Sequence, residues 1–199
     1  IGLDFDNTIV NYEPAIVLLA EEMLELPPEL ARTKLSIRKH LREKGREREW
    51  TIFQGALYGP GMRNAKTFEG AIETMKELIK LGHRLTIISH RSVKPYDGPA
   101  YDLHKAARNW IACHLNKANL FRNNSNGDIQ NDSVYFLESK QEKLERISQL
   151  DCNFFLDDLP EVLTDTRFPK ATTGILFDPC NQEADAGIVH RINRWENIL

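Results

Sequence analysis

Apolar residues gather in five short runs along the chain, at positions 2–5, 85–88, 134–137, 153–156 and 174–177. Each run is continuous, whereas a strand with one solvated face would alternate between apolar and polar residues. Continuous runs of this length are typical of strands that are covered on both faces. The pattern therefore predicts five buried β-strands.

Helical patterns separate most of these runs. Residues 67–81 place their apolar side chains on one face and are followed by Gly82, a common residue just after a helix. Similar patterns cover residues 103–115 and 144–150, and the second follows a capping-box pattern, Ser139-Lys140-Gln141-Glu142. Strands that alternate with helices favour right-handed crossovers. We therefore expect an α/β fold with a doubly wound parallel sheet.

One stretch interrupts this alternation. Between residues 11 and 66 no strand is evident, but two amphipathic helices are expected at 15–26 and 29–43, with Pro27-Pro28 between them and a less regular segment at 50–61. We interpret residues 1–10 and 67–199 as the core domain and 11–66 as a helical cap insertion. A lid over the active site is the favoured interpretation, and an elaborate crossover is the alternative. The polar stretch 123–128 is predicted to be a surface loop.

Composition narrows the function. The 199 residues are 41% hydrophobic and 28% charged, which suits a folded enzyme, and the net charge of −3 with no basic block argues against nucleic acid as a partner. No apolar run is long enough to cross a membrane. The three cysteines lack a CxxC spacing, which argues against a disulfide framework. We expect a cytoplasmic protein with no membrane partner.

Four aspartates follow two of the predicted strands. Asp4 and Asp6 end the first strand, and Asp157 and Asp158 follow the fourth. Ligands bind beyond the carboxyl ends of parallel strands, and carboxylates gathered there repel one another unless a cation neutralises them. A set of oxygen ligands without histidine or cysteine favours Mg²⁺. We expect a magnesium site formed by these four residues.

These motifs resemble those of the haloacid dehalogenase (HAD) superfamily. Its first motif, Asp-x-Asp-x-Thr after an apolar strand, matches Asp4-Phe5-Asp6-Asn7-Thr8, and its second, a Ser or Thr that closes a strand, matches Ser89. The third, a lysine at the start of a helix, matches Lys143 or Lys140, and the fourth matches Asp157-Asp158. The Asp-Asp pair replaces the more common Gly-Asp form. The resemblance implies that the metal also takes a side-chain oxygen of Asp4 and the backbone carbonyl of Asp6.

The chemistry of phosphoryl transfer accounts for these residue types. Asp4 is the expected nucleophile and Asp6 the general acid and base. Ser89 and Lys143 are expected to stabilise the phosphoryl group. The candidate substrate contacts are Asn7, His90 and Arg91. The candidate specificity residues of the insertion are Trp50, Gln54, Tyr58 and Arg63, and for each of these a packing or surface role is the alternative.

The sequence therefore predicts a magnesium-dependent phosphatase that acts on a small phosphorylated metabolite through an aspartyl-phosphate. The first motif has an Asp two residues after the nucleophile. In this it resembles the motif of phosphatases and phosphomutases rather than that of dehalogenases. Two alternatives remain, a phosphomutase and a non-catalytic module that binds a phosphorylated ligand.

Overall fold

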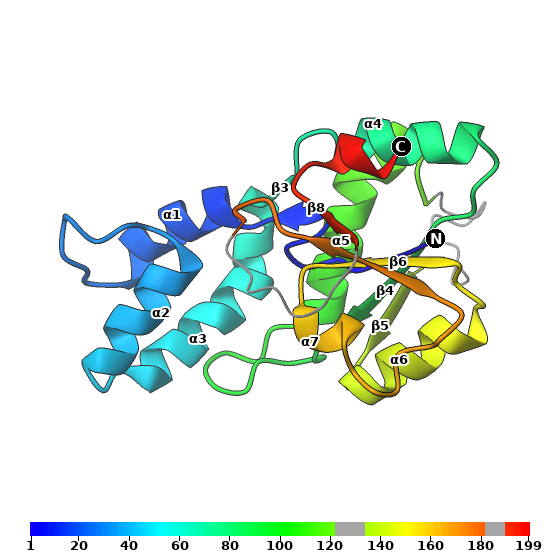
Figure 1. The fold of residues 1–199 in the computed structure, drawn as a ribbon. Helices are drawn as coiled ribbons and strands as arrows, with labels where there is room; N and C mark the ends of the chain where they lie inside the picture. Colours follow the sequence, from blue (N-terminus) through cyan, green and yellow to red (C-terminus); the bar gives the residue numbers. More distant parts are fainter. Residues whose placement is uncertain (122–133, 182–189) are drawn as a thin grey trace.

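A computed structural model describes residues 1–121, 134–181 and 190–199 (Figure 1). Within these residues the main sheet has six strands, all parallel, in the order β5-β4-β1-β6-β7-β8. The strands are β1 (Gly2–Leu3), β4 (Thr86–His90), β5 (Val134–Leu137), β6 (Phe154–Asp157), β7 (Thr173–Phe177) and β8 (His190–Ile192). The predicted α/β fold with a doubly wound parallel sheet is confirmed. The predicted loop at 123–128 lies outside the described residues.

Strand β8 was not predicted, for a physical reason. Its three residues, His190, Arg191 and Ile192, are exposed or half-buried at the edge of the sheet. A strand of that kind does not need a continuous apolar run, so the hydrophobic pattern does not report it.

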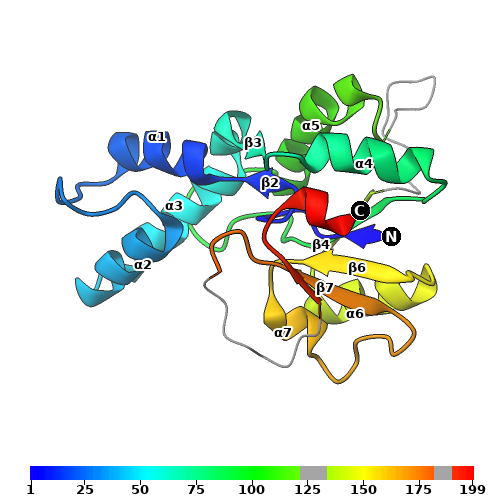
Figure 2. The same ribbon diagram turned by 45° about the horizontal axis from the view of Figure 1, so that its top comes forward.

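Helices cover both faces of the sheet. Figure 2 shows α4 (Ala71–Lys80) and α5 (Leu103–His114) on one face, and α6 (Lys140–Gln149) and α7 (Pro160–Leu163) on the other. The predicted capping box is present, because the Ser139 side chain accepts from the Glu142 N–H and the Glu142 side chain accepts from the Ser139 N–H. Short 3-10 turns follow at η2 (Asn116–Ala118) and η3 (Trp195–Ile198).

The insertion forms a helical cap beside the carboxyl ends of the strands (Figures 1 and 2). It contains α1 (Glu13–Met23), α2 (Lys34–Glu43), α3 (Glu47–Tyr58) and the 3-10 helix η1 (Pro60–Asn64). A short antiparallel pair that was not predicted, β2 (Val10–Asn11) with β3 (Lys66–Thr67), joins it to the sheet. This pair lies at the predicted boundaries between core and insertion; the division into two domains stays a prediction.

Two predictions for the cap were wrong in detail. The less regular segment is mostly the helix α3, whose apolar face includes Trp50, Phe53 and Leu57. The second helix begins at Lys34 rather than at residue 29, because the Thr33 side chain accepts from the Ser36 N–H and caps it there.

Hydrophobic packing encloses the central strands. One cluster joins the sheet to α4, α5 and the cap, and a second joins it to α6 and α7 through side chains such as Ile88, Leu144 and Phe155. The indole of Trp195 is fully buried and donates from Nε1 to the Thr8 carbonyl at 3.0 Å, which fixes the loop after β1. Among the described residues, no helix combines the length and apolar character needed to cross a membrane.

The order of the strands creates the position of the site. The chain passes from β1 to β4 and β5 on one side, and then returns to β6, β7 and β8 on the other. Strand β1 is therefore flanked by β4 and β6, and the sheet reverses its winding beside it. In open parallel sheets, ligands bind at this reversal, beyond the carboxyl ends of the strands.

The close packing of β1 gives a first prediction. A Cβ atom at Gly2 would lie 2.5 Å from Cδ2 of the buried Phe155 and 3.1 Å from the Cys152 Sγ. We expect Gly2→Ala to cost about 1–3 kcal/mol of unfolding free energy, measured as a lowered midpoint of thermal unfolding.

The matched control is Gly174→Ala in β7, whose Cβ would meet the mobile Cδ2 end of Leu163 at 3.1 Å. It should be milder. A Gly2→Ala protein as stable as the wild type would contradict this packing.

Candidate active site

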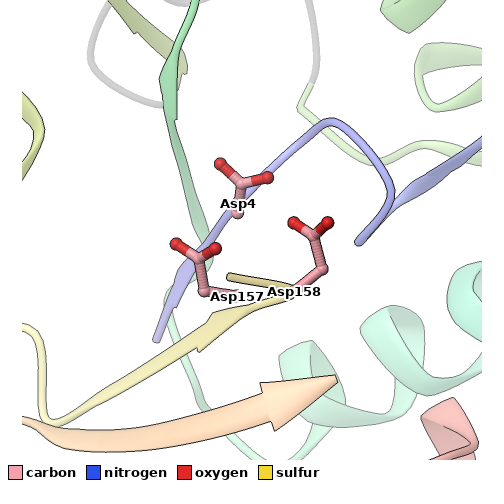
Figure 3. Close-up of side chains that lie close together, drawn as sticks. All are labelled: Asp4, Asp157 and Asp158. Carbon is pink, nitrogen blue, oxygen red and sulfur yellow. The ribbon is translucent and has the colours of Figure 1, made fainter. Parts of the chain in front are cut away.

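Three aspartates meet where β1 and β6 end (Figure 3). The Asp4 N–H donates to the Leu156 carbonyl at 2.8 Å, which continues the pairing of β1 with β6 and places Asp157 beside Asp4. Asp158 follows on the loop, and the Thr8 hydroxyl lies 3.5 Å from its Oδ1. One carboxylate oxygen from each of Asp4, Asp157 and Asp158 lies within 4.8 Å of the others. Parallel pairing therefore gathers the two acidic motifs that the sequence separates.

Lys143 lies between two of these carboxylates. Its Nζ is 2.6 Å from Asp4 Oδ1 and 2.6 Å from Asp157 Oδ2, and the side chain is 2% exposed. Burial alone would lower the pKa of Lys143, but Asp157 and Asp4 outweigh it and raise this pKa above its usual value. The ammonium therefore stays charged and holds the end of β1 against the end of β6.

One lysine does not balance three carboxylates. Burial raises the pKa of Asp4 to about 7. Lys143 opposes this rise, and Asp157 and Asp6 add to it. Burial, and then Asp4 and Asp157, also raise the pKa of Asp158 well above its usual value. Burial is the largest cause of both shifts, and the repulsion between neighbouring carboxylates adds to it. The cluster thus has the charge and the oxygen donors that suit a hard divalent cation.

The second candidate lysine points elsewhere. Lys140 Nζ is 2.8 Å from Asp165 Oδ2 and donates to the Glu161 carbonyl at 3.3 Å. It lines the mouth of the cavity described below but does not reach Asp4. Of the two lysines that match the third motif, the structure brings only Lys143 to the carboxylates.

Asp6 is oriented away from this cluster. Its Oδ1 accepts a hydrogen bond from the buried Tyr12 hydroxyl and another from Arg91 Nη1 at 2.6 Å. The side chain of Asp6 is therefore not part of the group of carboxylates that lie close enough to share a cation. The sequence analysis had included Asp6 in the predicted magnesium site. Burial first, and then Asp6, raise the pKa of Tyr12 well above its usual value, so its phenol stays a proton donor.

Arg91 connects Asp6 to the cap. Its side chain is 3% exposed, and each of its three nitrogens has a protein acceptor. Besides the bond to Asp6, Nη2 donates to the Tyr58 carbonyl at 2.6 Å, at the end of α3, and Nε donates to the Leu103 carbonyl at 3.2 Å. The guanidinium, predicted as a substrate contact, thus has its donors directed at the protein itself.

A cavity of about 520 Å³ opens above these groups. Its core side contains Asp4, Asp6, Lys143 and Asp158, and its cap side contains Lys34, Thr51, Gln54 and Tyr58. The predicted residues Asn7, Ser89, His90 and Arg91 also line it. Ser89 is buried at the end of β4, whereas His90 is exposed and its Nε2 lies 3.1 Å from the Glu138 carbonyl. The volume suits a small metabolite.

Two of the four predicted specificity residues do not line this cavity. Trp50 is 2% exposed and stacks on Phe53 inside the cap, with ring centroids 5.8 Å apart. Arg63 lies on a separate hollow of about 430 Å³, between η1 and α5. The alternative of a packing or surface role fits both residues, because the apolar face of α3 turns Trp50 inward and η1 places Arg63 outside this cavity.

The chain is similar to known proteins in its structure rather than in its sequence. No protein-family model matches the sequence, and no curated protein matches it. The HAD-hydrolase YfnB from Bacillus subtilis, solved bound to magnesium, has a TM-score of 0.58 at 14% identity, with 99% of this chain and 95% of that chain covered. A HAD phosphatase from Thermococcus onnurineus has a TM-score of 0.53 at 12% identity, over 99% and 94% of the chains. A dehalogenase has a TM-score of 0.57 at 14% identity, over 99% and 93%.

This chain has the HAD fold. The resemblance seen in the motifs is thereby confirmed for the fold. Because the similar structures include a phosphatase and a dehalogenase, the HAD fold alone does not decide the reaction, which depends on the residues of the site.

Two groups at the site were missed by the sequence analysis. Tyr12 lies only six residues beyond Asp6 and could have been proposed as its partner. Lys34 comes from a cap helix and had no sequence signal, because nothing in its neighbourhood shows that α2 begins at the cavity.

Removal of the central ammonium gives a second prediction. Lys143→Met leaves Asp4 and Asp157 buried side by side, and breaking a buried pair in this way costs about 3–5 kcal/mol. We expect a clearly lower midpoint of thermal unfolding at pH 8 in a chelating buffer.

Lys140→Met is the matched control, because the Lys140 side chain is 36% exposed and its partner Asp165 keeps a second ion pair, with Arg167 at 2.9 Å. Its midpoint should stay close to that of the wild type. Equal midpoints for both variants would mean that Lys143 does not neutralise the cluster.

Proposed function

We propose that this protein is a magnesium-dependent phosphatase that hydrolyses a small phosphorylated metabolite through an aspartyl-phosphate on Asp4. The observation that carries the proposal is the buried Asp4 carboxylate on the floor of a cavity of about 520 Å³, in contact with Lys143 and beside the Asp157–Asp158 pair. A carboxylate nucleophile, neutralising positive charge and a nearby second acid are what a two-step displacement at phosphorus needs.

The donor set supports magnesium as the cation. Both oxygens of Asp157 already accept hydrogen bonds, from Lys143 Nζ at 2.6 Å and from the Leu159 N–H at 3.0 Å. Asp4 and Asp158 are therefore the carboxylates with more capacity to bind a cation, and by the family resemblance the backbone carbonyl of Asp6 would join them. Bound there, Mg²⁺ would neutralise the oxygens of the phosphoryl group.

The residues of this chain account for both steps. In the first step an Asp4 oxygen attacks phosphorus, the bond to the leaving oxygen breaks, and Asp6 protonates that oxygen. In the second step Asp6 takes a proton from water, whose oxygen attacks phosphorus and releases phosphate from Asp4. Lys143 balances the charge of Asp4 and of the phosphoryl oxygens, and the Ser89 hydroxyl donates to the phosphoryl group.

The contacts of Asp6 connect it to the cap. Its Oδ1 is held by Arg91 and Tyr12, and Arg91 also holds the Tyr58 carbonyl of the cap. Movement of the cap over a substrate shifts Tyr58, and with it the guanidinium that restrains Asp6. In this proposal, cap movement and the readiness of the general acid are coupled through Arg91.

The competing reactions differ in what they require. A phosphomutase would use the same residues and return the phosphoryl group to its substrate, and a binding module would not turn over. A halide leaving group needs no proton, whereas Asp6 stands two residues beyond the nucleophile, where it can protonate an alkoxide. Release of inorganic phosphate without an added acceptor separates the phosphatase from all three.

The nucleophile provides the third prediction. Asp4→Asn replaces the attacking carboxylate with a neutral amide, whose oxygen is a poor nucleophile, so turnover of p-nitrophenyl phosphate should fall by a factor on the order of 10⁴ or more, measured as nitrophenol release in magnesium buffer.

Asp151→Asn is its matched control, because Asp151 is exposed and has a positive φ of 47° that asparagine also tolerates. It should keep full activity. An Asp4→Asn protein that is folded by circular dichroism yet turns over near the wild-type rate would disprove the covalent step.

A fourth prediction concerns the metal. Treatment with EDTA should abolish hydrolysis, and Mg²⁺ should restore it. Mg²⁺ should also raise the midpoint of thermal unfolding, because a ligand bound only by the native state stabilises that state, by about 2.7 kcal/mol at 100 times its Kd.

Asp158→Asn should reduce this stabilisation by Mg²⁺, whereas Asp165→Asn, outside the cluster, should not. Hydrolysis that survives chelation, or that only Zn²⁺ restores, would show that the carboxylates serve another purpose.

A further inference from the structure

A lysine of the cap faces the cavity from the side opposite the strand ends. Lys34 is the first residue of α2, and its Nζ donates to the Tyr58 hydroxyl at 2.8 Å. Lys34 and Tyr58 both line the cavity of about 520 Å³, together with Gln54 of the same cap. The three side chains form a polar wall beyond the place where a phosphoryl group would meet Asp4.

Lys34 differs from the other cations that line this cavity. Arg91 is paired with Asp6, Lys143 with Asp4 and Asp157, and Lys140 with Asp165, each at 2.8 Å or less. For Lys34 the described part of the chain supplies the Tyr58 hydroxyl and no carboxylate within 4.0 Å. A half-buried ammonium with no counter-ion is well suited to an anion supplied by a ligand.

Electrostatics keep this ammonium charged and within the field of the site. Tyr58 contributes most to the rise in the pKa of Lys34, burial opposes it, and Asp158 and Asp6 raise it further. Lys34 lines the same cavity as Asp158 and Asp6. Its location at the start of α2 is unfavourable for a cation, because the helix dipole is positive there. The fold thus retains a cation against its local preference.

Tyr58 gives Lys34 a rigid support. The Tyr58 carbonyl accepts from Arg91 Nη2 at 2.6 Å, and its ring packs edge-on against Tyr12 with centroids 5.0 Å apart. Because the Tyr58 hydroxyl accepts from Lys34, its own hydrogen is available to a further acceptor. A pre-organised ammonium and hydroxyl favour an anionic ligand with little loss of conformational entropy.

We propose that Lys34, supported by Tyr58, binds a second anionic group of the substrate, so that the protein prefers small phosphomonoesters that carry an acid group beyond the ester. This inference rests on the proposed phosphatase function, because it assumes that the first phosphoryl group lies at Asp4. A carboxylate and a second phosphate share the required chemistry.

The test compares matched esters. We expect wild-type kcat/KM in magnesium buffer to be at least tenfold higher for 3-phosphoglycerate than for glycerol 3-phosphate, which has the same carbon chain without the carboxylate. Lys34→Met should lower this ratio by about tenfold or more, toward one, as expected for loss of a hydrogen bond to a charged group, mainly through KM. Ribose 1,5-bisphosphate against ribose 5-phosphate tests the second phosphate in the same way.

The control is Lys39→Met on the same helix, since Lys39 is exposed and its ion pair with Glu43 is long at 4.0 Å. It should leave the ratio unchanged. Lys34→Arg should restore most of the ratio, because it keeps the charge, and it serves as the test should Lys34→Met fail to fold. The inference would be overturned if the wild type prefers neither ester in either pair. It would also be overturned if Lys34→Met lowers kcat/KM equally for both esters of a pair.

Binding separates this inference from the proposed function. In Asp4→Asn protein, which is expected not to turn over, calorimetry should show tighter binding of 3-phosphoglycerate than of glycerol 3-phosphate, and Lys34→Met in that background should abolish the difference. If wild-type protein hydrolyses no ester, p-nitrophenyl phosphate included, the phosphatase proposal fails, while this binding difference still decides the role of Lys34. Equal affinities for the two esters would overturn it.

Discussion

The ion pairs of Lys143 with Asp4 and Asp157 are the contacts on which the rest of the site depends. Parallel pairing of β1 with β6 places the two carboxylates next to each other, and burial removes the water that would otherwise screen them. Their repulsion is tolerable because one ammonium lies 2.6 Å from each. The same ammonium leaves the third carboxylate, Asp158, uncompensated, and that excess of negative charge makes the site suitable for a divalent cation.

Around this centre the protein separates two kinds of positive charge. Lys143 and Arg91 are paired with aspartates and hold the carboxylates of Asp4 and Asp6 in place. Among the described residues, Lys34 on the cap has the Tyr58 phenol and no carboxylate as its partner, and it lines the cavity from the cap side. In our account, charges fixed in the core carry the chemistry, and a charge on the cap selects the substrate. Arg91 links the two parts, because it contacts both Asp6 and the Tyr58 carbonyl.

The sequence predicted the features that depend on local pattern. Apolar runs reported the buried strands, and the Asp4 and Asp157 motifs could be placed together because parallel strands end at one edge of a sheet. The edge strand β8 was not predicted because it is short and polar. The helix α3 was not predicted because Gly55 and the β-branched Thr51 and Ile52 weaken its helical pattern. Gly55 is needed there, since a Cβ atom would lie 2.7 Å from Pro95.

The site residues that the sequence could not rank depend on long-range contacts. Lys140 and Lys143 lie within one turn of the same helix, and only the packing of α6 against β4 decides which of them reaches Asp4. Lys34 meets the cavity only because α2 and α3 pack together in the cap. Such contacts leave no periodicity in the sequence.

The central claim is that Asp4 carries the phosphoryl group, and trapping that intermediate tests it most directly. Wild-type protein turning over p-nitrophenyl phosphate with Mg²⁺ is quenched in acid within one turnover, digested and analysed by mass spectrometry. The account predicts that the peptide containing Asp4 gains the mass of one phosphoryl group, and that the gain disappears once substrate is exhausted. Phosphate release at the normal rate with an unmodified Asp4, or with the phosphoryl group on another residue, would contradict it.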